Sequence, residues 1–203
     1  MRIYIFRHGR PAHKGARILG ARGFARWVEE HDSCGLDPAS TPTRRAIEAA
    51  SQCKAVVTSS MPRASASASL LFPGKSILVE SSLVEFGIPT PKVPLLIMPP
   101  DLWVALSRSL WMLGMTRGTE SYSDATDRAA RGAEMLIRIA SFNKSVAFVG
   151  HGMLNLQLAS ELRKRGWRGP AVPGGSYWDV TEYTSGLVPI GSPKGAMPNP
   201  EAV

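Results

Sequence analysis

The sequence has little cysteine and no long apolar run. Cys34 and Cys53 are the two cysteines among 203 residues, and they form neither a CxxC motif nor a set with the spacing of metal ligands. Two isolated cysteines are typical of a reducing compartment. No stretch reaches the roughly 20 apolar residues that span a bilayer, and no secretory signal precedes the first apolar run. These absences predict a cytoplasmic protein without a metal, a disulfide framework or a membrane partner.

Acidic residues are outnumbered by basic ones. The chain has 24 Lys and Arg against 16 Asp and Glu, which gives a formal net charge of +8. Such a charge favours anionic partners, although a solvated basic surface explains it equally well. The basic residues are scattered, and no helical pattern combines a long basic face with interleaved aromatic residues. The sequence therefore does not favour nucleic acid as a partner.

Apolar runs alternate with helical patterns along the chain, which predicts an α/β fold. The arrangement expected is a single three-layer α/β/α domain with a mostly parallel sheet. The expected strands cover residues 2–6, 54–58, 76–80, 145–149 and 176–181. The expected helices cover residues 41–52, with Pro42 at the first helical position, and then 61–71, 101–113, 121–140 and a stretch that follows residue 151.

The domain organisation follows from composition. Residues 1–183 are expected to form the domain, and residues 184–203 a tail rich in Pro and Gly. Five prolines interrupt the segment 88–100, and a short helix follows them. We expect residues of about 88–120 to form a small helical insertion over the active site.

The segment Arg7-His8-Gly9 directly follows the first expected strand. An imidazole has an unperturbed pKa of about 6.5, so near neutral pH it is a ready nucleophile. The guanidinium of Arg7 can hold phosphate oxygens with its planar fork of N–H groups, and Gly9 lets the backbone turn sharply. An isolated histidine at a strand end is more often structural, but its two neighbours predict a nucleophile in an anion-binding pocket.

Two further segments repeat this placement after other expected strands. Ser59 to Arg63 leads into one helix, and Gly150-His151-Gly152 leads into another. Because a helix N-terminus presents free N–H groups, we expect those of Gly152 and Met153 to face an anion beside Arg63. The carboxyl ends of parallel strands meet at one edge of a sheet, where α/β proteins bind ligands. The three segments therefore predict a single site.

Together with the acidic residue Glu85, these motifs closely resemble the histidine phosphatase superfamily. This group includes cofactor-dependent phosphoglycerate mutases and many phosphatases. The resemblance implies that His8 becomes phosphorylated, and that Arg7, Arg63 and His151 grip the phosphoryl group. It also implies that Glu85 protonates the leaving oxygen.

The resemblance covers residues 1–183 and implies a metal-independent phosphomonoester phosphatase that needs no cofactor. Its partner would be an anionic phosphorylated small molecule or a phosphoprotein. A phosphoglycerate or phosphosugar mutase is one alternative, but mutases carry an arginine shortly after the acidic residue, and Phe86-Gly87-Ile88 contains none. A non-catalytic binder of phosphorylated ligands is another, but it would need no proton donor such as Glu85. The substrate and the oligomeric state stay open.

Basic side chains crowd the segment after the nucleophile, where the family often has Glu or Gln, then Thr, and a nearby Asn. They are Arg10, His13, Lys14, Arg17 and Arg22. If they face the cleft, they favour a strongly anionic substrate; the alternative is a solvated loop. Just beyond them, near-helical spacing predicts a core or cleft-wall patch formed by Phe24, Trp27 and Val28.

Overall fold

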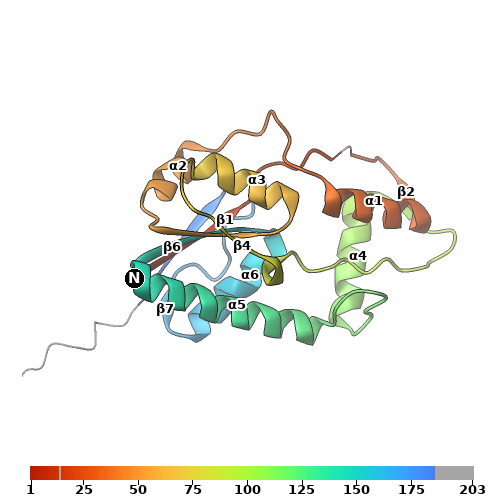
Figure 1. The fold of residues 1–203 in the computed structure, drawn as a ribbon. Helices are drawn as coiled ribbons and strands as arrows, with labels where there is room; N and C mark the ends of the chain where they lie inside the picture. Colours follow the sequence, from red (N-terminus) through yellow and green to blue (C-terminus); the bar gives the residue numbers. More distant parts are fainter. Residues whose placement is uncertain (14, 186–203) are drawn as a thin grey trace, which may run out of the picture.

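The computed structural model describes residues 1–13 and 15–185, in which a six-stranded sheet lies between two layers of helices (Figure 1). The strands of this sheet are β1 (Arg2–Arg7), β3 (Ala55–Ser59), β4 (Leu78–Glu80), β6 (Ser145–Gly150), β7 (Trp167–Arg168) and β8 (Val180–Ser185). A separate two-stranded ribbon consists of β2 (Leu19–Gly20) and β5 (Ile97–Met98). The helices are α1 (Ala21–Ser33), α2 (Arg44–Ser51), α3 (Pro62–Leu71), the 3-10 turn η1 (Ser81–Leu83), α4 (Pro100–Met112), α5 (Tyr122–Asn143) and α6 (Gly152–Lys164).

The strand order of the main sheet is β4-β3-β6-β1-β8-β7. The first four of these strands run parallel, whereas β8 runs antiparallel to β1 and β7 antiparallel to β8. The predicted α/β fold with a mostly parallel sheet is thereby confirmed. In register, Arg7 lies opposite Gly150, and Val149 lies opposite Thr58. The three strands that precede the predicted site residues therefore end side by side.

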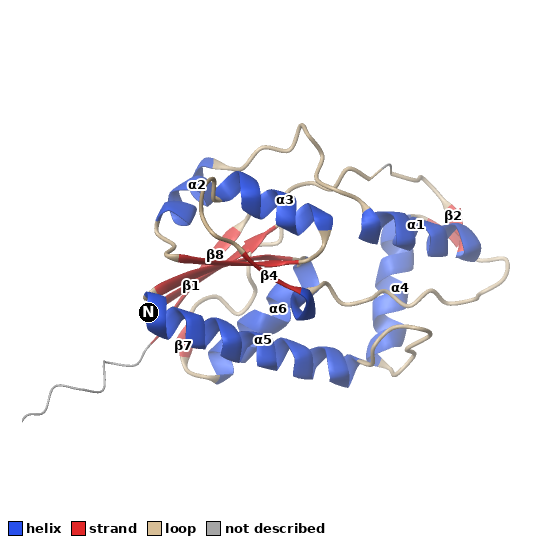
Figure 2. Ribbon diagram, in the orientation of Figure 1, coloured by secondary structure: helices blue, strands red, loops and turns tan. Residues whose placement is uncertain are grey.

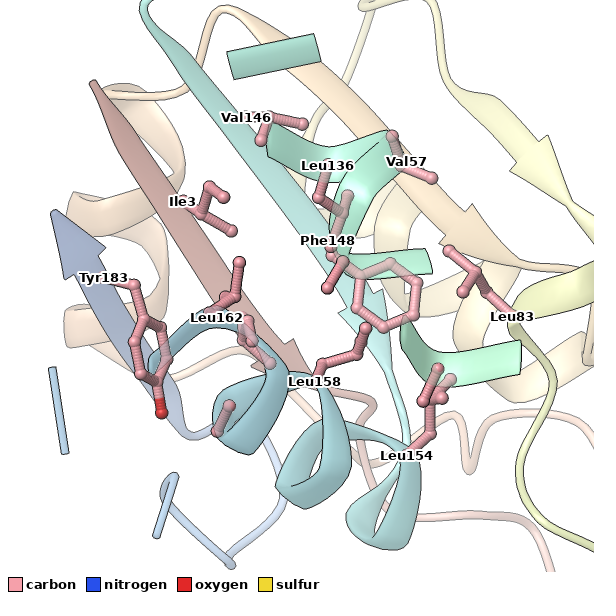
Figure 3. Close-up of a cluster of buried hydrophobic side chains, with 14 of the residues drawn as sticks. Ile3, Val57, Leu83, Leu136, Val146, Phe148, Leu154, Leu158, Leu162 and Tyr183 are labelled. Carbon is pink, nitrogen blue, oxygen red and sulfur yellow. The ribbon is translucent and has the colours of Figure 1, made fainter. Parts of the chain in front are cut away.

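Both faces of the sheet are buried, because side chains alternate between the faces along each strand. In β1, Ile3 and Ile5 pack toward α5 and α6, whereas Tyr4 and Phe6 pack toward α2 and α3. Figure 3 shows the first of these clusters, in which Phe148 of the central strand β6 lies near Leu158 of α6. This rigid core fixes the carboxyl ends of the parallel strands relative to one another.

A small cap built from β2, α1, β5 and α4 stands beside the sheet and apart from its helix layers (Figure 2). Its own core centres on Phe24, Val28 and Trp103, and the Trp103 indole N–H donates to the Leu19 carbonyl oxygen at 2.7 Å. The predicted insertion of residues 88–120 supplies only β5 and α4. The other half comes from residues 19–33, where α1 contains the predicted patch of Phe24, Trp27 and Val28 and places Arg22 on a helix rather than in a loop.

Several predicted boundaries are wrong, including the end of the predicted helix 121–140, which continues to Asn143. The first predicted helix begins at Arg44, because the Thr43 hydroxyl caps it by accepting from the Ala46 N–H at 3.2 Å, and Pro42 lies outside. The last predicted strand begins at Val180, since residues 176–179 form a turn in which Trp178 has a left-handed φ of 64°. This strand continues to Ser185, two residues into the segment predicted as a tail, and residues 186–203 lie outside the described residues.

Candidate active site

The His8 imidazole lies at the carboxyl end of β1 and is only 4% exposed. Its Nδ1 lies 2.7 Å from the carbonyl oxygen of Gly9, so this nitrogen carries the proton and donates it. Its Nε2 accepts from the Nε–H of Arg63 at 3.3 Å, which keeps that lone pair unprotonated. Burial, reinforced by His151, Arg63 and Arg7, lowers the pKa of His8 to about 3. The ring is therefore neutral at physiological pH and presents a nucleophilic nitrogen.

The Arg63 guanidinium is almost completely buried, at 1% exposed. Besides the bond to His8, its Nη1 donates to the carbonyl oxygens of His31 at 2.9 Å and Asp32 at 3.2 Å. These carbonyls belong to the last turn of α1, where the negative end of the helix dipole favours a cation. Because α1 was not expected as a helix, this support for Arg63 was missed. The structure thus ties the cap directly to the predicted phosphate-binding arginine.

The His151 imidazole is fully buried, and its ring centre lies 5.1 Å from that of His8. Its Nε2 lies 2.9 Å from the Ser59 hydroxyl, which already accepts from the Met61 N–H at 3.2 Å. The Ser59 hydroxyl still has its proton to donate to Nε2, and in that arrangement the His151 proton resides on Nδ1. That Nδ1 is buried without a hydrogen-bond partner among the described residues. Burial and then Arg63 lower the pKa of His151 well below 6.5, so this ring offers a neutral N–H donor.

Glu85 lies at the N-terminus of α6. Its Oε1 accepts from the N–H groups of Phe86 at 3.0 Å and Leu154 at 2.9 Å, and its Oε2 accepts from the Met153 N–H at 3.1 Å. We expected the Met153 N–H to face an anion, and in this structure it donates to the Glu85 carboxyl group. The first N–H groups of a helix have no partner within the helix, and the carboxyl oxygens of Glu85 accept from them. A hydrogen bond from the Met153 N–H to the phosphoryl group stays a prediction, and it requires Glu85 to move.

Gly152 lies between the predicted acid and Arg7. A Cβ added to Gly152 would be 3.8 Å from the Arg7 guanidinium carbon and 3.8 Å from Glu85 Oε2. Arg7 donates to the Gly175 carbonyl oxygen and stacks on the Tyr177 ring, with 4.9 Å between guanidinium and ring centre. Its Nε is buried without a partner in the described part of the chain. The site thus brings together all seven predicted residues and adds Tyr177, which no local sequence signal identified.

A pocket of about 840 Å³ is lined by six of the seven predicted residues and by Tyr177, whereas the fully buried His151 is not among its lining residues. Four arginines and four carboxylates line it, so its charge is balanced although the chain is strongly basic. Of the basic residues after the nucleophile, only Arg10 and His13 are among the lining residues, and residue 14 is not described. Arg10 is paired with Asp37 at 2.8 Å, and burial lowers the pKa of His13 below its usual 6.5. The structure does not bear out a cleft crowded with free cations.

A cation does lie beside Glu85, and it comes from the cap. Arg108 of α4 lines the pocket and donates from Nη2 to the Phe86 carbonyl oxygen at 2.7 Å and from Nη1 to the Gly87 carbonyl oxygen at 2.8 Å. The sequence lacks an arginine directly after Glu85, but the fold supplies this one from a distant segment. No signal local to residues 85–88 could have revealed it.

Within residues 1–13 and 15–185, no helix has the length and apolar character needed to cross a membrane. In the same residues, no group of three or more His, Cys, Asp or Glu side chains is arranged to hold a metal ion.

No family model matches this chain, and no curated protein sequence matches it. Solved structures do match its fold. One is described as mycobacterial hydrolase 1, at 19% identity and a TM-score of 0.61, over 94% of this chain and 92% of that one. Another is a mycobacterial glucosyl-3-phosphoglycerate phosphatase in complex with VO3, at 22% identity and a TM-score of 0.57, over 89% and 91%. A third is a phosphoglycerate mutase from Bacillus anthracis, at 15% identity and a TM-score of 0.56, over 92% of each chain.

These likenesses confirm the predicted fold over about nine-tenths of the chain. The matching structures include both phosphatases and a mutase, and their identities of 15–22% do not choose between these activities.

Proposed function

We propose that this chain, which has the histidine phosphatase fold, is a metal-independent phosphomonoester phosphatase that works through a phosphohistidine on His8. The observation that carries the proposal is the state of the His8 ring. Its Nδ1–H is fixed by the Gly9 carbonyl oxygen at 2.7 Å, and its lowered pKa keeps Nε2 unprotonated. A nucleophile in this state needs no general base before it attacks.

The first step forms a bond between His8 Nε2 and phosphorus and breaks the bond between phosphorus and the leaving oxygen. Arg7 and Arg63 neutralise the charge on the equatorial oxygens, and the Nδ1–H of His151 donates a further hydrogen bond. Glu85 gives its proton to the leaving oxygen. Arg63 then exchanges its bond with His8 Nε2 for one with the phosphoryl group.

The second step hydrolyses the phosphohistidine. A water oxygen attacks phosphorus, Glu85 takes the water proton, and the bond between phosphorus and Nε2 breaks. Inorganic phosphate leaves, and both side chains return to their starting state. The balanced positive charge of two arginines against a dianion makes a metal ion unnecessary for this sequence of steps.

The test is to trap the phosphoenzyme. Brief incubation with a labelled phosphomonoester, followed by quenching in base, should leave label on the peptide that contains His8, and acid should release it. His8→Asn should abolish both the label and turnover, because an amide nitrogen is not a nucleophile, while its N–H can still donate to the Gly9 carbonyl oxygen. Turnover should also survive chelation of divalent metals by EDTA.

Glu29→Gln on the exposed surface of α1 is a matched control for Glu85→Gln. The control should behave as wild type, and Glu85→Gln should slow alkyl phosphates far more than aryl phosphates, whose leaving groups depart without a proton. Turnover of His8→Asn above a few per cent of wild type would exclude the mechanism.

A further inference from the structure

The pocket is larger than a phosphoryl group requires. Its volume of about 840 Å³ lies in the upper part of the range found for pockets that hold whole small molecules. Besides His8, Arg7 and Arg63, residues from α1, α4 and the segment 10–13 line the pocket. The space beside this second group of residues, which we call the distal subsite, must receive the organic part of a substrate.

The cations of the distal subsite already have hydrogen-bond partners. Arg10 pairs with Asp37 at 2.8 Å, and Arg108 directs both terminal nitrogens to backbone carbonyl oxygens. Two further carboxylates, Asp32 and Asp101, line the same space. A second anionic group on the substrate would therefore meet acidic side chains and guanidinium groups whose hydrogen bonds are already made. The charge pattern disfavours doubly anionic substrates.

Three ring nitrogens without hydrogen-bond partners belong to residues of this subsite. Seven buried side-chain N or O atoms lack a hydrogen-bond partner in the described residues, and three of them are His13 Nε2, Trp27 Nε1 and His31 Nδ1. All three residues line the pocket. Buried polar atoms without partners are rare because the lost hydrogen bonds to water are not replaced, so their concentration here points to a ligand that completes them.

The chemistry of these atoms selects the ligand group. The Trp27 indole N–H can only donate, so it needs an acceptor. The Asp32 carboxylate can only accept, and its Oδ1 lies 3.6 Å from His31 Nδ1 and 3.8 Å from Arg63 Nη2, beyond hydrogen-bond distance, so it can still take a donor. A hydroxyl group does both. A cationic amine cannot accept from Trp27, and an anion is repelled by Asp32. The Trp27 ring is also packed against three others, stacked with Phe24 at 6.0 Å and His31 at 5.3 Å and T-shaped with His13 at 5.0 Å, so it offers no free stacking surface.

We infer that the substrate is the monophosphate of an uncharged, hydroxyl-rich molecule, such as a sugar or a polyol, whose hydroxyl groups bind His13, Trp27 and His31. This inference rests on the proposed phosphatase function and adds the substrate class to it.

The sharpest test compares glycerol 3-phosphate with 3-phosphoglycerate, which differ by a hydroxymethyl group in place of a carboxylate. We expect kcat/KM to be at least tenfold higher for glycerol 3-phosphate, and phosphocholine to be as poor as 3-phosphoglycerate. Asp37→Asn should narrow the preference severalfold, because it exposes the charge of Arg10 while the Asn oxygen can still accept from the Ala39 N–H. A preference for 3-phosphoglycerate or for phosphocholine would overturn the inference.

Trp27→Phe removes one N–H group and keeps the ring. It should lower kcat/KM for glycerol 3-phosphate about threefold to tenfold, as expected for one neutral hydrogen bond, and leave p-nitrophenyl phosphate unchanged. Tyr122→Phe, which removes a hydroxyl group at the start of α5, is the matched control. An equal loss on both substrates would show that Trp27 only supports the cap and would overturn its assignment.

The two proposals fail in different ways. If no phosphomonoester is hydrolysed, including p-nitrophenyl phosphate, the proposed phosphatase function fails. The substrate class is then decided by calorimetric titration with the same pair of ligands. Tighter binding of glycerol 3-phosphate would support the distal subsite as inferred, and tighter binding of 3-phosphoglycerate would refute it.

Discussion

Burial of the neutral His8 ring should make the folded protein sensitive to acid. In the folded state the pKa of His8 is about 3, because desolvation penalises the charged ring, whereas in the unfolded chain it returns to about 6.5. Between these two values the unfolded chain binds a proton that the folded protein does not. Stability is therefore fully present above about pH 6.5 and is lost as the pH falls from there toward 3.

The magnitude follows from the two pKa values. Lowering the pH from 7 to 5 protonates His8 in the unfolded chain but not in the folded protein, which costs about 2 kcal/mol of unfolding free energy. The full loss, reached below pH 3, is about 5 kcal/mol, at 1.36 kcal/mol per pKa unit. His151 is lowered in the same direction and adds to the effect. The total is a large part of the 5–15 kcal/mol that stabilises a typical domain.

The assay is urea unfolding at pH 5, 6 and 7, followed by tryptophan fluorescence, for wild type and His8→Asn. The substitution removes one titrating group, so any constant change in stability cancels when the two pH dependences are compared. Wild type should lose about 2 kcal/mol more than His8→Asn between pH 7 and pH 5. Parallel pH dependences would show that the His8 ring is not held neutral in the folded state, and the proposed nucleophile would lose its physical basis.

Two further predictions concern the residues around this ring. Arg63→Lys should lower kcat/KM roughly a hundredfold, since lysine cannot reproduce the planar fork that reaches both His8 and the end of α1. Full activity, equal to that of the exposed control Arg26→Lys, would show that Arg63 does not touch the substrate. Gly9→Ala should destabilise the fold by about 3 kcal/mol in urea unfolding, because the new Cβ would press into the Trp178 ring. Gly35→Ala places its Cβ in open space and should not destabilise the fold. Equal urea midpoints for the two alanine variants would contradict the packing argument.

The sequence carries enough information to predict the sheet and the residues at its edge. The strands β1, β3 and β6 are continuous apolar runs, which is the pattern of strands buried on both faces. Each ends in a polar motif, and parallel pairing in register then brings the motifs together without further information. The convergence of His8, Arg63 and His151 needs only strand order and direction, and both are constrained by general rules of α/β folds.

The cap is harder to predict because it is held by contacts between distant segments. Helix α1 buries only Phe24 and Val28. Phe24 stacks on Trp103, which lies 79 positions further along the chain, with 5.2 Å between the ring centres. Local periodicity suggested a patch at residues 24–28, but a short amphipathic signal amid basic residues did not predict a helix. Arg108 has no local signal at all, since its role depends on where α4 crosses the segment after Glu85.

Arg108 also bears on whether this site suits a hydrolase or a mutase. The lack of an arginine at residues 86–88 does not mean that no cation is near, because α4 supplies one at the same segment. A mutase must hold a second anionic group while the phosphoryl group is returned to the substrate. Here, a carboxylate that recruited Arg108 would have to replace two charge-assisted hydrogen bonds to carbonyl oxygens, each worth about 1.5–3 kcal/mol. The hydrogen bonds of this guanidinium, more than its position in the sequence, therefore favour net hydrolysis over transfer.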